Sequence, residues 1–136
     1  MVKISVETWF KNRKEGEVVK NPAWSQIETA IRQLDGKSKT LVTLGADDET
    51  YITIGGGELG KYVVSVTFDN IEFHNLVDLL KPDETEKLVV GGQEGIYSAK
   101  VCVDLLPCLV AARTFAESGK LDTLLAWQED ESLVAV

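Results

Sequence analysis

Residues 40–68, TLVTLGADDETYITIGGGELGKYVVSVTF, decide the fold that the sequence predicts. Three segments in this stretch, 40–44, 51–54 and 62–68, are rich in valine, isoleucine, threonine and tyrosine, which favour β-strands. The connections between them are too short to hold the crossover helix that parallel neighbours require. The stretch therefore predicts three consecutive antiparallel strands, a meander.

Further strands are expected on both sides of the meander. Downstream, 87–90 and 96–104 predict a hairpin around the glycine-containing turn 91–95. Upstream, Val2, Ile4 and Val6 alternate with polar residues and predict a half-buried strand, followed by a polar loop at 11–16. Residues 69–80 fit both a strand and a helical turn, and both interpretations stay open.

Two amphipathic helices complete the prediction. The first carries an apolar stripe, is capped by Asn21 with Pro22 or by a capping box of Ser25 and Glu28, and stops at Gly36. The second starts near Leu106 and ends at Gly119. The stripes are Trp24, Ile27, Ile31 and Leu34, then Leu105, Leu109, Ala112 and Ala116, and a last apolar group, Leu121, Leu124, Leu125 and Trp127, is expected to return to the core. The sequence predicts an α+β fold in which a curved antiparallel sheet of about five to seven strands, meander plus hairpin, packs against two amphipathic helices.

Length and charge narrow the possible functions. With 136 residues and no linker, the chain is expected to form one domain over residues 1–136. The net charge is −8, and residues 45–86 alone hold ten acidic residues against two lysines. A field of this sign repels nucleic acid and anionic membranes and attracts basic proteins. No apolar run reaches the roughly 20 residues that span a bilayer, and no secretory signal opens the chain, so a cytoplasmic location is expected.

Few residues offer catalytic or metal chemistry. His74 is the only histidine, and Cys102 and Cys108 have no metal or redox spacing and are expected to be buried free thiols. Gly55, Gly57 and Gly60 spell G-x-G-x-x-G, but a strand follows where a dinucleotide site needs a helix, so a bend, a bulge or a close backbone approach is the better interpretation. We expect no catalytic residue, no metal site and no cofactor. The alternative is a small-ligand-binding domain or an enzyme centred on His74.

The order of several segments is similar to that of a known family. The segments are Trp24-Ser25-Gln26-Ile27-Glu28 with Leu34-Asp35-Gly36, Tyr51-Ile52-Thr53-Ile54-Gly55-Gly56-Gly57, Tyr62-Val63-Val64, Leu88-Val89-Val90-Gly91-Gly92, and Ala111-Ala112-Arg113-Thr114-Phe115-Ala116-Glu117-Ser118-Gly119-Lys120-Leu121-Asp122 with Trp127. In this order and spacing they resemble immunity protein family one of bacterial polymorphic toxin systems. The resemblance covers about residues 24–129 and leaves residues 1–20 outside.

The resemblance implies a non-enzymatic antitoxin that binds and blocks a cognate toxin, often a nucleic-acid deaminase. The matching residues Trp24, Gly55, Gly56, Gly57, Gly119 and Trp127 are expected to be structural. An acidic face would complement the basic cleft of such a toxin. The residues predicted to touch the toxin are Asp47, Asp48, Glu49, Asp69, Glu72, Glu94 and Tyr97. The partner is expected to be a protein and neither nucleic acid nor a membrane, and the free chain is expected to be a monomer or a weak homodimer.

Overall fold

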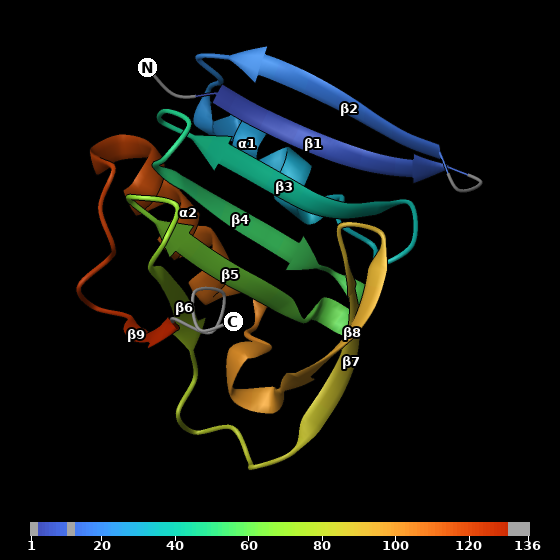
Figure 1. The fold of residues 1–136 in the computed structure, drawn as a ribbon, viewed down its shortest axis with the longest axis vertical. Helices are drawn as coiled ribbons and strands as arrows, with labels where there is room; N and C mark the ends of the chain where they lie inside the picture. The colour runs from blue at the N-terminus through green and yellow to red at the C-terminus, as the bar shows by residue number, and fades with distance from the viewer. Residues whose placement is uncertain (1–2, 11–12, 131–136) are drawn as a thin grey trace.

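The fold is α+β, as predicted, and combines a seven-stranded antiparallel sheet with a two-stranded sheet and two helices (Figure 1). A computed structural model describes residues 3–10 and 13–130. The large sheet has the order β2-β1-β3-β4-β5-β6-β9. In chain order the elements are β1 (Lys3–Phe10), β2 (Arg13–Lys20), α1 (Trp24–Arg32), β3 (Lys39–Gly45), β4 (Tyr51–Gly56), η1 (Glu58–Gly60), β5 (Tyr62–Thr67), β6 (Phe73–Val77), β7 (Thr85–Val90), β8 (Gln93–Ser98), η2 (Ala99–Val101), α2 (Leu105–Ser118) and β9 (Ala126–Asp130).

The two faces of the large sheet differ. Both helices lie behind it in Figure 1, and the side chains that face them form the core. These residues alternate along the strands, as in Val42 and Leu44 of β3 or Ile52 and Ile54 of β4, which are at most 1% exposed. Phe115 of α2 is fully buried among them. The other side, here called the open face, includes on β3 to β6 and β9 the residues Leu41, Thr43, Tyr51, Thr53, Val63, Ser65, Phe73, Asn75 and Gln128.

The hairpin of β7 and β8 packs across one end of the sheet. Val90 of β7 lies against the bare Cα of Gly55, where a Cβ atom would overlap its methyl groups. The amide of Gly92 donates to Thr40 Oγ1 over 2.8 Å. These contacts confirm the predicted second hairpin and the close backbone approach at the glycines. The bounds of the second strand differ from the prediction: β8 starts at Gln93, within the predicted turn 91–95, and ends at Ser98, where the chain turns into η2.

The predicted loop at 11–16 is wrong for residues 13–16, which belong to β2. This strand pairs with β1 along its whole length, from Lys3 opposite Lys20 to Phe10 opposite Arg13. β2 is an edge strand of the sheet, where charged residues are tolerated, so its polar sequence does not prevent pairing. Val2 and residues 11–12 lie outside the described part of the chain. Ile4 of β1 is buried, as its alternation predicts.

The first helix starts and stops differently from both predicted versions. Ala23 is the N-cap, and its amide donates to the Gln26 side chain over 2.8 Å, so neither Asn21 nor Ser25 caps the helix. Asn21 instead has a positive φ of 49°, which turns the chain before the helix. The helix ends at Arg32, ahead of Gly36, whose φ of +73° belongs to the next turn.

In the open segment 69–80, residues 73–77 form the strand β6, which pairs on one side with β5 and on the other with β9, whereas 69–72 are bends and 79–80 a turn. β9 itself is absent from the predicted elements. Its Trp127 packs against the core, as expected, whereas Leu124 just before it is 92% exposed and does not return to the core. Leu121 and Leu125 are partly buried against the core.

Asp35 closes the turn between α1 and β3, and its carboxylate controls the pH dependence of this turn. Its Oδ1 accepts from the amides of Lys37, Ser38 and Lys39 over 2.8–3.1 Å. Partial burial works to raise the pKa of Asp35, but these bonds outweigh it and hold the pKa below its ordinary value of 3.8. A carboxyl group with a lowered pKa stabilises the fold above its unfolded pKa and loses this effect as the pH falls through the folded pKa.

We therefore expect Asp35→Ala to lower the free energy of unfolding at neutral pH by about 1 kcal/mol. The difference from the unmodified chain should shrink as the pH falls from 3.8 through the lowered pKa of the folded chain, because the Asp35 carboxyl group is protonated first in the unfolded chain and then in the folded chain. Urea unfolding at several pH values measures both quantities. A difference that stays constant down to acidic pH would contradict this role for the ionised carboxylate.

Candidate functional site

Five of the predicted toxin-binding residues lie together at one end of the large sheet. Asp47, Asp48 and Glu49 form the β3–β4 turn, and Asp69 and Glu72 lie in the β5–β6 turn; we call these five residues the acidic turns. All five are exposed. Both turns leave the sheet at the same end, because Gly45, Tyr51 and Thr67 are register partners across β3, β4 and β5 (Figure 1).

Hydrogen bonds join the two turns. Thr50 Oγ1 donates to the carbonyl of Phe68 over 3.2 Å, and Tyr51 Oη donates to Asn70 Oδ1 over 2.6 Å. Asn70 has a positive φ of 62°, which places its side chain within the tight bend of the β5–β6 turn. The bonds fix the two turns relative to each other, so the acidic turns form one surface.

Asp47 and Asp69 also shape their own turns. Asp47 Oδ1 accepts from the amides of Glu49 and Thr50, and Asp69 Oδ1 accepts from the amides of Ile71 and Glu72, all over 2.8–2.9 Å. The backbone bonds from Glu72 and Ile71 lower the pKa of Asp69. These two carboxylates therefore stabilise the conformation of the turns and also contribute to their negative charge.

Glu94 and Tyr97 lie on β8, beside the opposite end of the sheet. Glu94 is exposed and Tyr97 is half-buried. The Tyr97 ring lies over Gly95, where a Cβ atom would come within 2.9 Å of the ring. Burial, followed by the nearby Cys102, raises the pKa of the Tyr97 hydroxyl. The structure thus does not bring Glu94 and Tyr97 together with the acidic turns.

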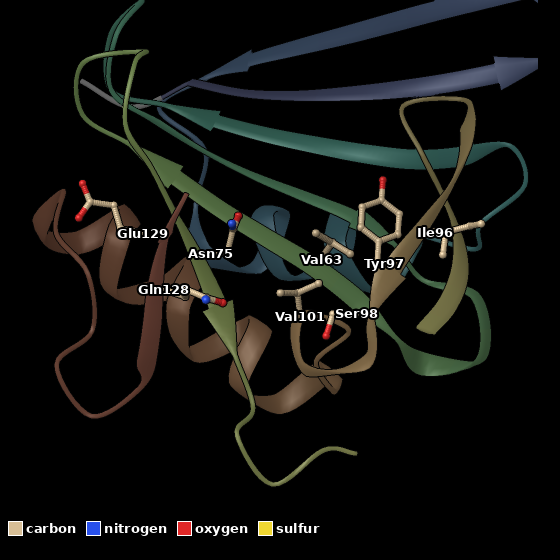
Figure 2. A pocket seen from close by; sticks show the side chains of 8 residues that line it. All are labelled: Val63, Asn75, Ile96, Tyr97, Ser98, Val101, Gln128 and Glu129. Atoms are coloured by element: carbon tan, nitrogen blue, oxygen red, sulfur yellow. The ribbon is translucent and has the colours of Figure 1, made fainter. Parts of the chain in front are cut away.

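A hollow on the open face lies between these two regions. We call it the open-face hollow; its volume is about 400 Å³ and it is lined by Val63, Asn75, Ile96, Tyr97, Ser98, Val101, Gln128 and Glu129 (Figure 2). Its floor comes from β5, β6 and β9, and its wall comes from β8 and η2. Sequence reasoning identified only Tyr97 of this set. Gln128 could not be placed because β9 was not predicted.

Two smaller hollows lie elsewhere. One of about 270 Å³ lies beside the hairpin and is lined by Glu58, Leu59, Lys61, Glu86, Lys87, Leu88, Val89 and Glu94. The other, of about 260 Å³, is mostly apolar and is lined by Leu76, Val77, Asp78, Leu79, Val103, Pro107, Leu124, Leu125 and Ala126. Glu94 therefore borders a different hollow from its neighbour Tyr97.

The residues expected to be structural hold elements together. Arg113 of α2 lies over the ring of Trp24 of α1 at 5.4 Å. Trp127 Nε1 donates to the carbonyl of Asp122 over 3.0 Å, and the Asp122 carboxylate accepts from Thr114 Oγ1 over 2.6 Å. Together these bonds tie α2 to β9.

The glycines of the same set permit backbone conformations or contacts that a side chain would disturb. Gly119 ends α2 with a φ of +69°, and its backbone amide donates a hydrogen bond to the carbonyl of Phe115. Gly56 and Gly57 have φ values of +93° and +100°. Gly57 also sits so close to Leu34 that a Cβ atom would overlap the Leu34 carbonyl.

The structure places His74 within the large sheet. It lies half-buried on β6, pairs with Val66 and Glu129 in the sheet, and its ring is 5.8 Å from that of Phe68. It does not line any of the three hollows above. Among residues 3–10 and 13–130, no group of three His, Cys, Asp or Glu side chains is arranged to hold a metal ion. In the described part of the chain, the three hollows and the metal-ligand search add no support for a site centred on His74.

Both cysteines are free and fully buried, as predicted. Burial raises the pKa of Cys102 to about 11 and that of Cys108 to about 12. Because the thiolate is the reactive form, we expect the native chain to react very slowly with a thiol reagent such as dithionitrobenzoate near pH 8. Both thiols should react at once in guanidinium chloride. Rapid modification of one thiol in the folded chain would contradict its burial.

The comparisons with known proteins decide the family. A family model described as Immunity protein Imm1 matches residues 15–129. The chain belongs to the Imm1 family. Neither the search of curated proteins nor that of solved structures found a match. The Imm1 assignment makes the chain an immunity protein, whose partner is a cognate toxin protein.

The Imm1 match extends beyond the resemblance read from the sequence. It begins at residue 15 in β2, ahead of Trp24, and ends at residue 129 in β9, so it includes most of both edge strands of the large sheet. β1 precedes the matched range but is paired with β2 on one side and β3 on the other. Within the described residues, no helix is long and apolar enough to cross a membrane.

Proposed function

We propose that this Imm1 protein binds its cognate toxin in the cytoplasm of the producing cell and covers the toxin's active cleft with the acidic turns. It acts by occupancy and catalyses no reaction. The toxin domain acts on nucleic acid, and the reaction that we propose for it is deamination. Free of its toxin, the protein is a monomer or a weak homodimer.

The observation that carries this proposal is the gathering of the acidic turns on one exposed surface of a chain that belongs to an immunity family. An enzyme that acts on nucleic acid must attract phosphates, so the entrance of its active cleft carries lysine and arginine. A surface with five carboxylates at one end of a sheet is complementary to such an entrance. The hydrogen bonds between the two turns support the proposal because they order this surface before the toxin arrives.

The test starts from the gene directly upstream of the coding sequence. Its C-terminal domain is expressed in a sensitive bacterium with and without the Imm1 protein, and an inactive variant of that domain is mixed with the purified Imm1 protein. We expect growth only when both proteins are present, and a 1:1 complex by light scattering. Cell death despite abundant folded Imm1 protein, with no complex in solution, would overturn the proposal.

A further inference from the structure

We propose that the open-face hollow receives an arginine-bearing loop of the toxin, which lies across the open face between the acidic turns and the β7–β8 hairpin. The inference rests on the proposed function for the identity of the partner. It adds a second contact region and states the chemistry of the group that this region binds.

The first argument is the position of the hollow. Its floor includes Asn75 of β6. β6 begins only two residues earlier, at Phe73, directly after the β5–β6 turn that carries Asp69 and Glu72. Its wall includes Tyr97 of β8, at the other end. Figure 2 shows Tyr97 on one side and Glu129 on the other, with Asn75 and Gln128 between them. A toxin that binds the acidic turns therefore lies next to the open-face hollow.

The second argument is the charge of the lining. Among the side chains that the structure describes, Glu129 is the one charged residue that lines the hollow, and no lysine or arginine lines it. The nearest cation along η2, Lys100, is turned elsewhere: its Nζ contacts Asp83 Oδ1 at 2.9 Å and donates to the carbonyl of Lys81 over 2.6 Å. A negative or neutral lining that excludes its neighbouring cation suits a positively charged occupant.

The third argument is the set of groups around the hollow. Asn75 and Gln128 contribute side-chain amides, Ser98 contributes a hydroxyl and Tyr97 contributes an aromatic ring. A guanidinium group presents several N–H donors in one plane and also stacks on aromatic rings, so it can donate to the Gln128 amide oxygen and the Ser98 hydroxyl and stack on the Tyr97 ring. Gly95 holds the Tyr97 ring against the hairpin backbone, since any larger residue would push the ring away. The ring is thereby ordered in advance.

The open face also differs from an ordinary solvent-facing sheet surface. In the middle of β3 to β6 and β9, its residues Leu41, Thr43, Tyr51, Thr53, Val63, Ser65, Phe73, Asn75 and Gln128 include no charge, and the charged positions in phase with them, Lys39 and Asp130, are at the ends of β3 and β9. Interface centres are depleted in charged residues and enriched in aromatic ones, and Tyr51 and Phe73 pack edge to face at 6.4 Å on this surface. The uncharged middle of the open face therefore fits the centre of a contact whose rim is formed by the acidic turns.

Opposite charges at one position provide the test. Gln128→Arg should weaken binding of the inactive toxin domain by roughly 30-fold or more, mainly through faster dissociation, because it places a cation where the toxin's arginine must lie. Gln128→Glu should preserve or strengthen binding. Thr29→Arg, on the exposed side of α1 in the helix layer, adds the same charge away from the hollow and should leave the affinity within about twofold.

Thermal unfolding of each variant checks that the fold is intact, and Tyr97→Leu gives a second measurement that adds no charge. It should weaken binding by about tenfold through loss of the stacking surface. Equal binding by all the variants would overturn the inference, and so would equal weakening by Gln128→Arg and Gln128→Glu, which indicates an uncharged occupant. If the unmodified protein forms no complex with the toxin domain, the proposed function itself fails.

Discussion

Replacing Gly57 by alanine is expected to lower the free energy of unfolding by about 3 kcal/mol, because two penalties coincide at this residue. Its φ of +100° is a conformation that L-residues rarely adopt. In addition, the new Cβ atom would overlap the carbonyl carbon and oxygen of Leu34, and these are backbone atoms that cannot move aside as a flexible side chain can. Chemical denaturation followed by tryptophan fluorescence measures the loss.

Gly60 provides a matched control three residues further on. Its φ is +72°, but a Cβ atom there would meet nothing within 4 Å. Gly60→Ala should therefore cost only the conformational penalty of about 1 kcal/mol. If the two variants lose the same stability, the contact between Gly57 and Leu34 contributes nothing beyond backbone conformation.

Removing the charges of the β3–β4 turn is expected to slow association with the toxin by about tenfold or more at low salt. The triple variant Asp47→Asn, Asp48→Asn and Glu49→Gln keeps each side chain nearly the same size. Asparagine at position 47 also keeps the oxygen that accepts from the amides of Glu49 and Thr50, so the turn should persist. Stopped-flow measurement over a range of salt concentrations separates the association rate from the dissociation rate.

The control variant removes three negative charges elsewhere. Glu28→Gln and Glu117→Gln lie on the two helices, and Glu84→Gln lies just before β7. This variant has the same net charge as the first but keeps the acidic turns. It should associate nearly as fast as the unmodified protein. If both triple variants slow association equally, total charge is responsible and the acidic turns have no special role.

The meander, the hairpin and both helices could be predicted from the sequence because each has a strong local pattern. Residues 40–68 hold three β-rich segments with short connections, and the helices hold apolar stripes at helical spacing. The core follows from the same alternation, as the burial of Val42 and Ile54 shows.

The edge strands could not be predicted because their pairing is not local. β2 is polar, and it forms a strand only because β1 lies beside it with unpaired backbone groups. β9 follows a loop that contains the exposed Leu124, and its partner β6 is some fifty residues earlier in the chain. No periodicity within either segment reveals such pairing.

The acidic turns were foreseen as a group because charge can be counted along a sequence. Their assembly on one surface depends on the register that aligns Gly45 with Tyr51 and Tyr51 with Thr67, which only the structure provides. For the same reason Glu94 and Tyr97 were grouped with them although they lie at the far end. The open-face hollow escaped prediction because its lining comes from five separate elements.

The separation between the anchoring glycines and tryptophans and the acidic turns bears on how such a protein diversifies. Trp24, Gly57 and Trp127 are constrained by neighbours on other elements, whereas Asp48 and Glu49 protrude from a loop beyond the hydrogen-bonded ladder. Substitutions at the loop can therefore accumulate at little thermodynamic cost. An immunity protein can therefore acquire specificity for an altered toxin through substitutions in its loops, while the packing of its helices and sheet stays unchanged.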